Sequence, residues 1–195
     1  MDASHKTARS NLAEPVWVNS MGGPLIVVPE SCVTAWGGCT EDGSVLGEAD
    51  GRDDYDRACA VDDWAGVIAV AAGAATALVL ADEPAKTCFL PEELLFVRWL
   101  AADSEGELFA AVKAVLANPD TPWEDCGLWA SDGPAVLMDS AEAGADLGVE
   151  YLSGGRPEQA LVQLPAGQFR VRAVHVKGES AWVGVVQLVA TDEPT

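Results

Sequence analysis

The chain has 195 residues, and 49% of them are hydrophobic, which excludes a protein that is disordered throughout. It carries 31 Asp and Glu residues against 11 Lys and Arg, a net charge of −20, which disfavours nucleic acid and anionic membranes as partners. A protein partner with a basic surface is favoured instead, although a generally acidic proteome would give the same balance.

The first residues are polar. Segment 1–15 has no apolar core of the kind that a secretory signal peptide needs, and we expect it to be a disordered tail. The longest apolar stretch, 67–81, is too short to cross a bilayer as a helix. We therefore expect a cytoplasmic protein whose five cysteines are reduced.

The segment after the tail predicts a strand followed by a long acidic loop. The run Leu25-Ile26-Val27-Val28 is short, largely β-branched and preceded by a Gly-Pro turn. Residues 37–63 then hold nine acidic and two basic residues together with several glycines. A loop of this length in a compact domain is usually functional or disordered, so this segment is the first place to look for a site.

The middle of the chain predicts an antiparallel meander and one helix. Apolar runs at 66–70, 75–80, 86–90 and 94–100 are separated by turn residues, and we expect four successive strands there. The helix is predicted at 104–117, because Ser104 is a suitable N-cap and apolar residues recur on one face until Asn118 and Pro119.

The remaining segments predict a second set of strands. They lie at 135–139, 149–152, 160–164, 168–176 and 181–189, after a connector at 119–127. The fold class is therefore α+β, mostly antiparallel sheet. We expect either one domain or two β-rich lobes, 16–118 and 128–190.

The two halves of the chain resemble each other faintly. Segments 17–28 and 129–138 both run from a tryptophan through a Gly-Pro turn into an apolar strand. Two related lobes would explain this similarity. Chance would also explain it, because a turn followed by a strand is common.

Metal and cofactor motifs are missing from the sequence. The two histidines, His5 and His175, have no cysteine or second histidine nearby, and 48–53 lacks the register of a calcium loop. We expect no metal and no cofactor. The alternative to a binding protein is a small hydrolase that uses paired carboxylates or a cysteine with His175, although no nucleophile elbow or Walker loop is present.

The candidate binding residues belong to the acidic loop and to the tryptophans that flank it. Carboxylates would attract a basic partner, and tryptophan is enriched at interface hot spots. The predicted partner-binding residues are Asp42, Glu48, Asp50, Asp53, Asp54, Asp56, Asp62, Asp63, Trp36 and Trp64.

An ordered set of segments resembles the immunity protein 21 family. The first is Trp17-Val18-Asn19-Ser20-Met21-Gly22-Gly23-Pro24 with the strand that follows it, and others lie at 54–59, 79–84, 98–100 and 133–140. The resemblance implies an α+β protein that binds and neutralises a cognate toxin of a bacterial polymorphic toxin system, without enzymatic activity. It implies no particular site residues. The charge predicts that the toxin is basic, for example a nuclease, whose surface must bind phosphates.

Overall fold

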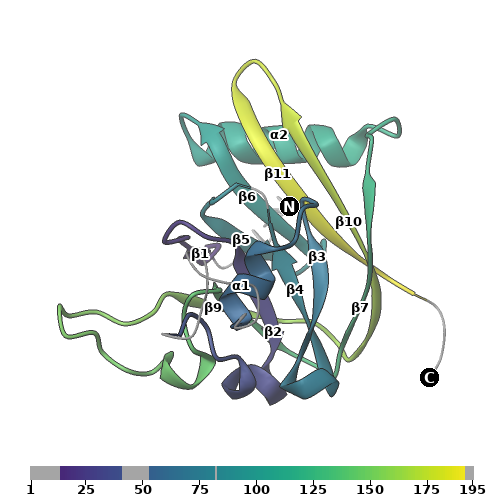
Figure 1. Ribbon diagram of the computed structural model, residues 1–195. Coiled ribbons are helices and arrows are strands. Elements are labelled where there is room, and N and C mark those ends of the chain that lie inside the picture. Colours follow the sequence, from purple (N-terminus) through teal and green to yellow (C-terminus); the bar gives the residue numbers. More distant parts are fainter. Residues whose placement is uncertain (1–13, 41–52, 82, 192–195) are drawn as a thin grey trace, which may run out of the picture.

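The computed structural model describes residues 14–40, 53–81 and 83–191, which form two antiparallel sheets packed face to face (Figure 1). Helix α2 (Glu105–Ala117) lies across the outer face of the larger sheet. The predicted α+β class with mostly antiparallel strands and one main helix is therefore confirmed.

Six strands form the larger sheet, and each pairs antiparallel with its neighbours. Their spatial order is β1 (Trp17–Val18), β5 (Thr87–Leu90), β6 (Leu95–Ala102), β11 (Ala181–Ala190), β10 (Gly167–Lys177) and β7 (Glu124–Ser131).

Five strands form the smaller sheet, again with antiparallel pairing throughout. Their order is β3 (Gly66–Val70), β4 (Ala75–Leu80), β2 (Leu25–Pro29), β8 (Ala135–Asp139) and β9 (Gln159–Val162). The short elements η1 (Glu30–Ala35), α1 (Asp54–Cys59), η2 (Ala71–Gly73) and η3 (Gly144–Asp146) complete the described structure.

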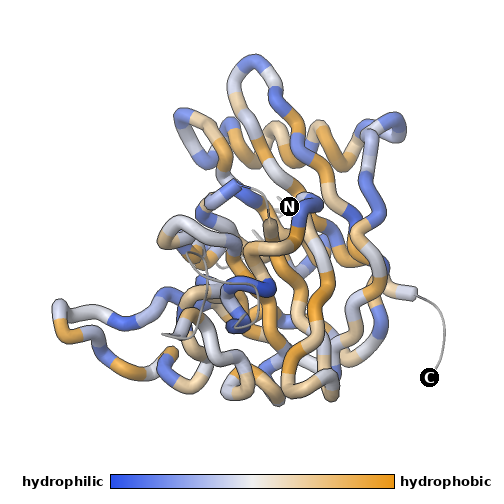
Figure 2. The backbone as a smooth tube through the Cα atoms, viewed as in Figure 1, coloured by the Kyte–Doolittle hydropathy of each residue, from blue (hydrophilic) through white to orange (hydrophobic). Residues whose placement is uncertain are grey.

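Three apolar layers hold these elements together. The main core lies between the sheets and includes Trp129 and Phe169. A second layer covers the outer face of the smaller sheet around Trp36. The third lies between α2 and the larger sheet, where burial of Leu108 and Val112 contributes about 1.5–3 kcal/mol for each side chain. Figure 2 shows hydrophobic residues recurring along the strands and hydrophilic residues at several of the turns.

The continuous meander predicted for 66–100 is wrong at one step. Strands β3 and β4 form a hairpin in the smaller sheet, whereas β5 and β6 form a hairpin in the larger one. The chain crosses between the sheets after β4, and the buried Arg98 of β6 holds this crossing by donating hydrogen bonds to the carbonyls of Ala81 and Glu83.

Two further local predictions need correction. The strand predicted at 149–152 is absent, and Val149 and Leu152 are exposed there. The stretch 37–63 is predicted as a loop, but its described part contains α1, because the Asp53 side chain caps a short helix.

The order of the strands is symmetric in both sheets. In each sheet, corresponding strands from the two halves of the chain lie at equal distances from the centre. In the larger sheet the corresponding strands are β6 and β11, β5 and β10, and β1 and β7. In the smaller sheet they are β2 and β8, and β4 and β9, and β3 is an additional strand. Val27 and Leu137 face each other at the centre of the smaller sheet, and they occupy equivalent places in the similar segments 17–28 and 129–138. Each sheet contains strands from both halves of the chain. The predicted connector at 119–127 therefore does not separate the two sheets, and its residues 124–127 belong to β7. This arrangement supports an internal duplication.

Candidate functional site

Three of the predicted acidic residues, Asp42, Glu48 and Asp50, lie outside the described residues. The next two stabilise local structure. Asp53 accepts hydrogen bonds from the backbone N–H of Asp56 at 2.8 Å and of Thr40 at 2.7 Å, which caps α1.

Asp54 ties α1 to the beginning of the acidic stretch. Its carboxylate accepts a hydrogen bond from the backbone N–H of Gly37 at 2.8 Å and forms an ion pair with Arg57. Asp56 is 9% exposed, within the same helix. The carboxylates at the start of α1 thus have structural partners inside the protein.

Trp36 is a core residue. Its side chain is 1% exposed, and its indole N–H donates a hydrogen bond to the carbonyl of Ser140 at 3.0 Å. The prediction that it is an exposed anchor is therefore wrong, because η1 carries the ring onto the outer face of the smaller sheet.

The last three predicted residues lie together at the surface. Asp62 and Asp63 are exposed, and the half-buried Trp64 follows them just before β3. The indole ring of Trp64 stacks on the imidazole of His175 from β10, with 4.6 Å between the ring centroids and 6° between the planes. The end of the acidic segment therefore meets a strand from the other half of the chain.

Glycine makes room for this stack. Gly184 of β11 faces His175 on one side and Arg98 of β6 on the other. A Cβ atom on Gly184 would lie 2.9 Å from Nε2 of His175 and 3.1 Å from Cβ of Arg98. Any side chain at this position would displace the imidazole, so the geometry of the stack depends on Gly184.

A second tryptophan extends the same surface. Trp182 and Lys177 are partners in the β10–β11 register, and they lie two residues beyond Gly184 and His175, on the same face of the sheet. The ammonium group of Lys177 is 5.4 Å from the centre of the Trp182 ring.

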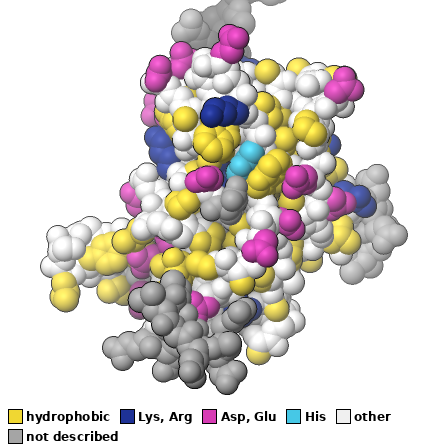
Figure 3. All heavy atoms as spheres, turned by 45° about the horizontal axis from the view of Figure 1, so that its top comes forward, with side chains coloured by type: hydrophobic (Ala, Val, Ile, Leu, Met, Phe, Trp, Pro, Cys, Tyr) yellow, Lys and Arg dark blue, Asp and Glu magenta, His cyan; other side chains and the backbone are white. Residues whose placement is uncertain are grey.

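We call this surface the Trp64 face and define it by Asp62, Asp63, Trp64, His175, Lys177 and Trp182. Figure 3 shows the imidazole (cyan) between hydrophobic side chains (yellow), with acidic side chains (magenta) around them. The face combines aromatic rings with carboxylates, which is the composition that suits a basic protein partner.

Cations elsewhere in the described residues also lie over tryptophan rings. Lys86 is 3.9 Å from the centre of the Trp99 ring, and the guanidinium of Arg172 is 4.3 Å from that of Trp123. Across the described ranges only two ion pairs form, Asp54–Arg57 and Asp125–Arg170, and Asp62 and Asp63 take part in neither. The negative charge of the Trp64 face is therefore not neutralised by ion pairs within the described structure.

Two of the cysteines, Cys88 and Cys126, do not have the properties of a nucleophile. Burial raises the pKa of Cys88 to about 12, and burial together with nearby carboxylates, Asp63 among them, raises the pKa of Cys126 to about 11. Both thiols are protonated at neutral pH, whereas a catalytic cysteine needs a lowered pKa. The observed environments give no support to a hydrolase that uses either thiol.

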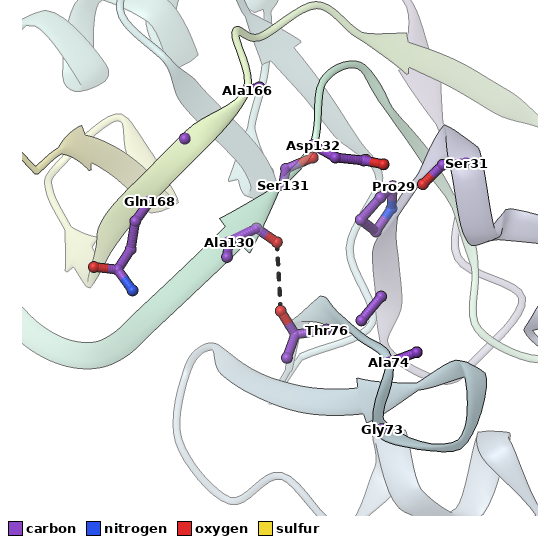
Figure 4. A pocket seen from close by; sticks show the side chains of 12 residues that line it. Pro29, Ser31, Gly73, Ala74, Thr76, Ala130, Ser131, Asp132, Ala166 and Gln168 are labelled. Carbon is purple, nitrogen blue, oxygen red and sulfur yellow. Dashed lines mark hydrogen bonds between the residues drawn. The ribbon is translucent and has the colours of Figure 1, made fainter. Parts of the chain in front are cut away.

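A cavity of about 770 Å³ lies where the turns before β4, after β7 and before β10 meet (Figure 4). The hydroxyl of Thr76 donates a hydrogen bond to the carbonyl of Ala130 across it, at 3.4 Å. Asp132 is the single ionisable side chain among the described residues that line it. One carboxylate does not provide the acid and base pair that the hydrolase alternative requires.

The described ranges contain neither a cluster of metal ligands nor a helix that could span a membrane. No three His, Cys, Asp or Glu side chains gather there in a way that could hold a metal ion. None of the helices described has the length and hydrophobicity needed to cross a bilayer.

Comparison with known proteins gives one match. The sequence model of the family described as Immunity protein 21 matches residues 16–181, which confirms the resemblance found in the sequence. Neither a curated protein nor a solved structure matches the chain.

Proposed function

The chain belongs to the immunity protein 21 family, and from this premise we propose that it binds a cognate bacterial toxin in the cytoplasm of the producing cell and neutralises it. The toxin is a basic protein, for example a nuclease. The protein acts by occupying the toxin surface and not by catalysis.

The observation that carries this proposal is the Trp64 face, where exposed aspartates that form no ion pair in the described structure lie next to aromatic rings. The chain has a net charge of −20, and the exposed Asp62 and Asp63 directly precede the half-buried Trp64. Carboxylates supply long-range attraction, while a tryptophan in a desolvated contact supplies a large share of binding energy. A basic toxin would meet both on one surface.

The same charge suits rapid capture. An immunity protein has to bind before the toxin acts, and charge complementarity raises association rate constants to about 10⁸–10⁹ M⁻¹s⁻¹ at low salt. The carboxylates at the start of α1 extend the negative field beyond the face itself, although hydrogen bonds tie them to the protein.

We expect the cognate toxin to be encoded by a neighbouring gene, and its toxin domain is the partner to use in the test. Asp62→Asn combined with Asp63→Asn should slow association and weaken its dependence on salt, because two charges of the face are removed. Trp64→Ala should raise the dissociation rate constant by about tenfold, the effect of losing one hot-spot side chain. Stopped-flow fluorescence separates the two rate constants.

The matched control removes two carboxylates elsewhere. Asp146→Asn with Glu150→Gln has the same change in net charge at two exposed positions near η3. It should leave association nearly unchanged. If both double variants slow binding equally, overall charge and not the Trp64 face directs the encounter. If the parent protein neither binds this toxin domain nor protects cells that express it, the proposed function is wrong.

A further inference from the structure

A groove with a volume of about 500 Å³ lies on the opposite edge of the sandwich from Trp64. Its walls come from three elements that are distant in sequence: Phe89 of β5, Phe109 and Leu116 of α2, and Leu161 of β9. The volume falls within the range of about 300–1,000 Å³ that is usual for ligand pockets. The walls are mainly apolar, more so than those of the cavity beside Thr76.

Exposed apolar side chains concentrate at this groove. Val16 is 60% exposed, Leu161 is 53% exposed and Leu116 is 37% exposed, and all three line it. Large exposed apolar residues that gather in one place mark interaction surfaces more often than residues scattered singly. Strand β9 also pairs with β8 alone in the described part of the chain, so its other edge has no strand partner there.

The charges at the groove select the kind of partner. Glu14, Glu92 and Glu93 are exposed and line it, against one cation, Lys113. A second copy of the chain would bring these carboxylates, and a further net charge of −20, against the same groove. A segment with an apolar core and flanking basic residues would complement both the apolar walls of the groove and the three glutamates at its rim.

We propose that this groove, between α2, β5 and β9, is a docking site for an apolar segment of a partner protein that is flanked by Lys or Arg residues. The site is separate from the Trp64 face, and its use does not depend on the proposed neutralisation of a toxin. The apolar core of the segment contacts Phe89, Phe109 and Leu161. The flanking cations lie against Glu92 and Glu93.

Three synthetic peptides test the proposal on the full chain by isothermal titration calorimetry. The first has a core of four Val and Leu residues between pairs of Lys, the second has the same core between pairs of Glu, and the third has a Ser-Gly core between pairs of Lys. We expect binding of the first peptide alone. Leu161→Asp should weaken it by about tenfold, since the substitution places a charge in the apolar wall.

The charge of the rim is tested by Glu92→Gln with Glu93→Gln, which should weaken the first peptide by about threefold and reduce its salt dependence. Leu152→Asp, at a fully exposed position in the loop before β9, is the matched control for Leu161→Asp and should change nothing.

Four results would overturn the proposal. Equal binding of the Glu-flanked peptide would show that charge does not select the partner. Binding that Leu161→Asp leaves unchanged would show that the peptide binds outside this groove. Binding seen only after deletion of residues 1–13 would assign the groove to this chain's own first residues. A dimer in analytical ultracentrifugation that Leu161→Asp dissociates would assign it to a second copy.

Discussion

Replacement of Gly184 by alanine tests the geometry of the Trp64 face directly. Two effects of opposite sign compete at this position. Alanine is more favourable than glycine inside a strand by about 0.5–1 kcal/mol. The new methyl group, however, would lie 2.9 Å from Nε2 of His175 and 3.1 Å from Cβ of Arg98. Overpacking of this kind costs about 1–3 kcal/mol, so we expect Gly184→Ala to lower the free energy of unfolding by about 1–2 kcal/mol.

A double-mutant cycle with His175→Ala identifies the cause. Removal of the imidazole eliminates the closest contact and leaves only the one to Arg98, so Gly184→Ala should be close to neutral in that background. The coupling free energy between the two positions should then be about 1 kcal/mol or more. Urea unfolding followed by tryptophan fluorescence and circular dichroism measures all four proteins, with the dependence on urea unchanged.

The melting temperature provides an independent measure. In a protein of this size, a loss of 1 kcal/mol lowers the melting temperature by about 2–4 °C. A cost of Gly184→Ala that is the same with and without the imidazole would refute the argument, because the strain would then come from Arg98 or from the backbone.

Three other substitutions or reactions test single contacts. Asp53→Ala should destabilise the protein by about 0.5–2 kcal/mol through loss of the α1 cap, whereas Asp62→Ala should stay within about 0.5 kcal/mol of the parent in urea unfolding. Arg98→Met should cost at least about 2 kcal/mol, because two carbonyls at the crossing between the sheets lose their donor, while Arg170→Met at an exposed ion pair should cost less than about 1 kcal/mol. At pH 8, Cys126 should react with iodoacetamide about 100-fold more slowly in the folded than in the unfolded protein, since its pKa of about 11 leaves little thiolate, and the rate should rise as the pH approaches 11. Mass spectrometry of the labelled peptide would show an equal rate in both states if this reasoning is wrong.

Local signals in the sequence are sufficient to predict most of the elements. Helix α2 follows from its cap at Ser104 and from the spacing of its apolar residues, and both appear in the structure. The ambiguous apolar run at 94–100 is a strand, as predicted, and forms β6. These properties depend on neighbouring residues, and a single sequence contains that information.

The crossing between the sheets could not be predicted in the same way. A turn that contains Asp82, Glu83 and Pro84 is equally compatible with a hairpin inside one sheet and with a passage to the other. The hydrogen bonds that hold the crossing come from Arg98 in β6, the second strand after the crossing. The choice between the two topologies therefore depends on a tertiary interaction.

The site was predictable only in part. Asp62, Asp63 and Trp64 are at the surface as expected, but Trp36 carries an equally suitable side chain and is buried. The sequence presents His175 as a possible metal ligand or as a partner for a cysteine, and neither role predicts that its imidazole stacks on Trp64, just before β3. The alternation along β10 does place His175 on the same face as Phe169 and Ala173, and this was the one signal that pointed to it.

The exchange of strands between the two halves determines when a newly made chain becomes able to bind a partner. The pairs β2–β8 and β6–β11 stand at the centres of the two sheets, and each joins residues that are far apart in the chain. Neither sheet can be completed before the ribosome has translated both halves of the chain. Pairing between residues that are far apart in the chain also slows folding, to milliseconds to seconds. Under the proposed function, a cell that makes this protein together with its toxin depends on copies of the protein that have already been released and folded.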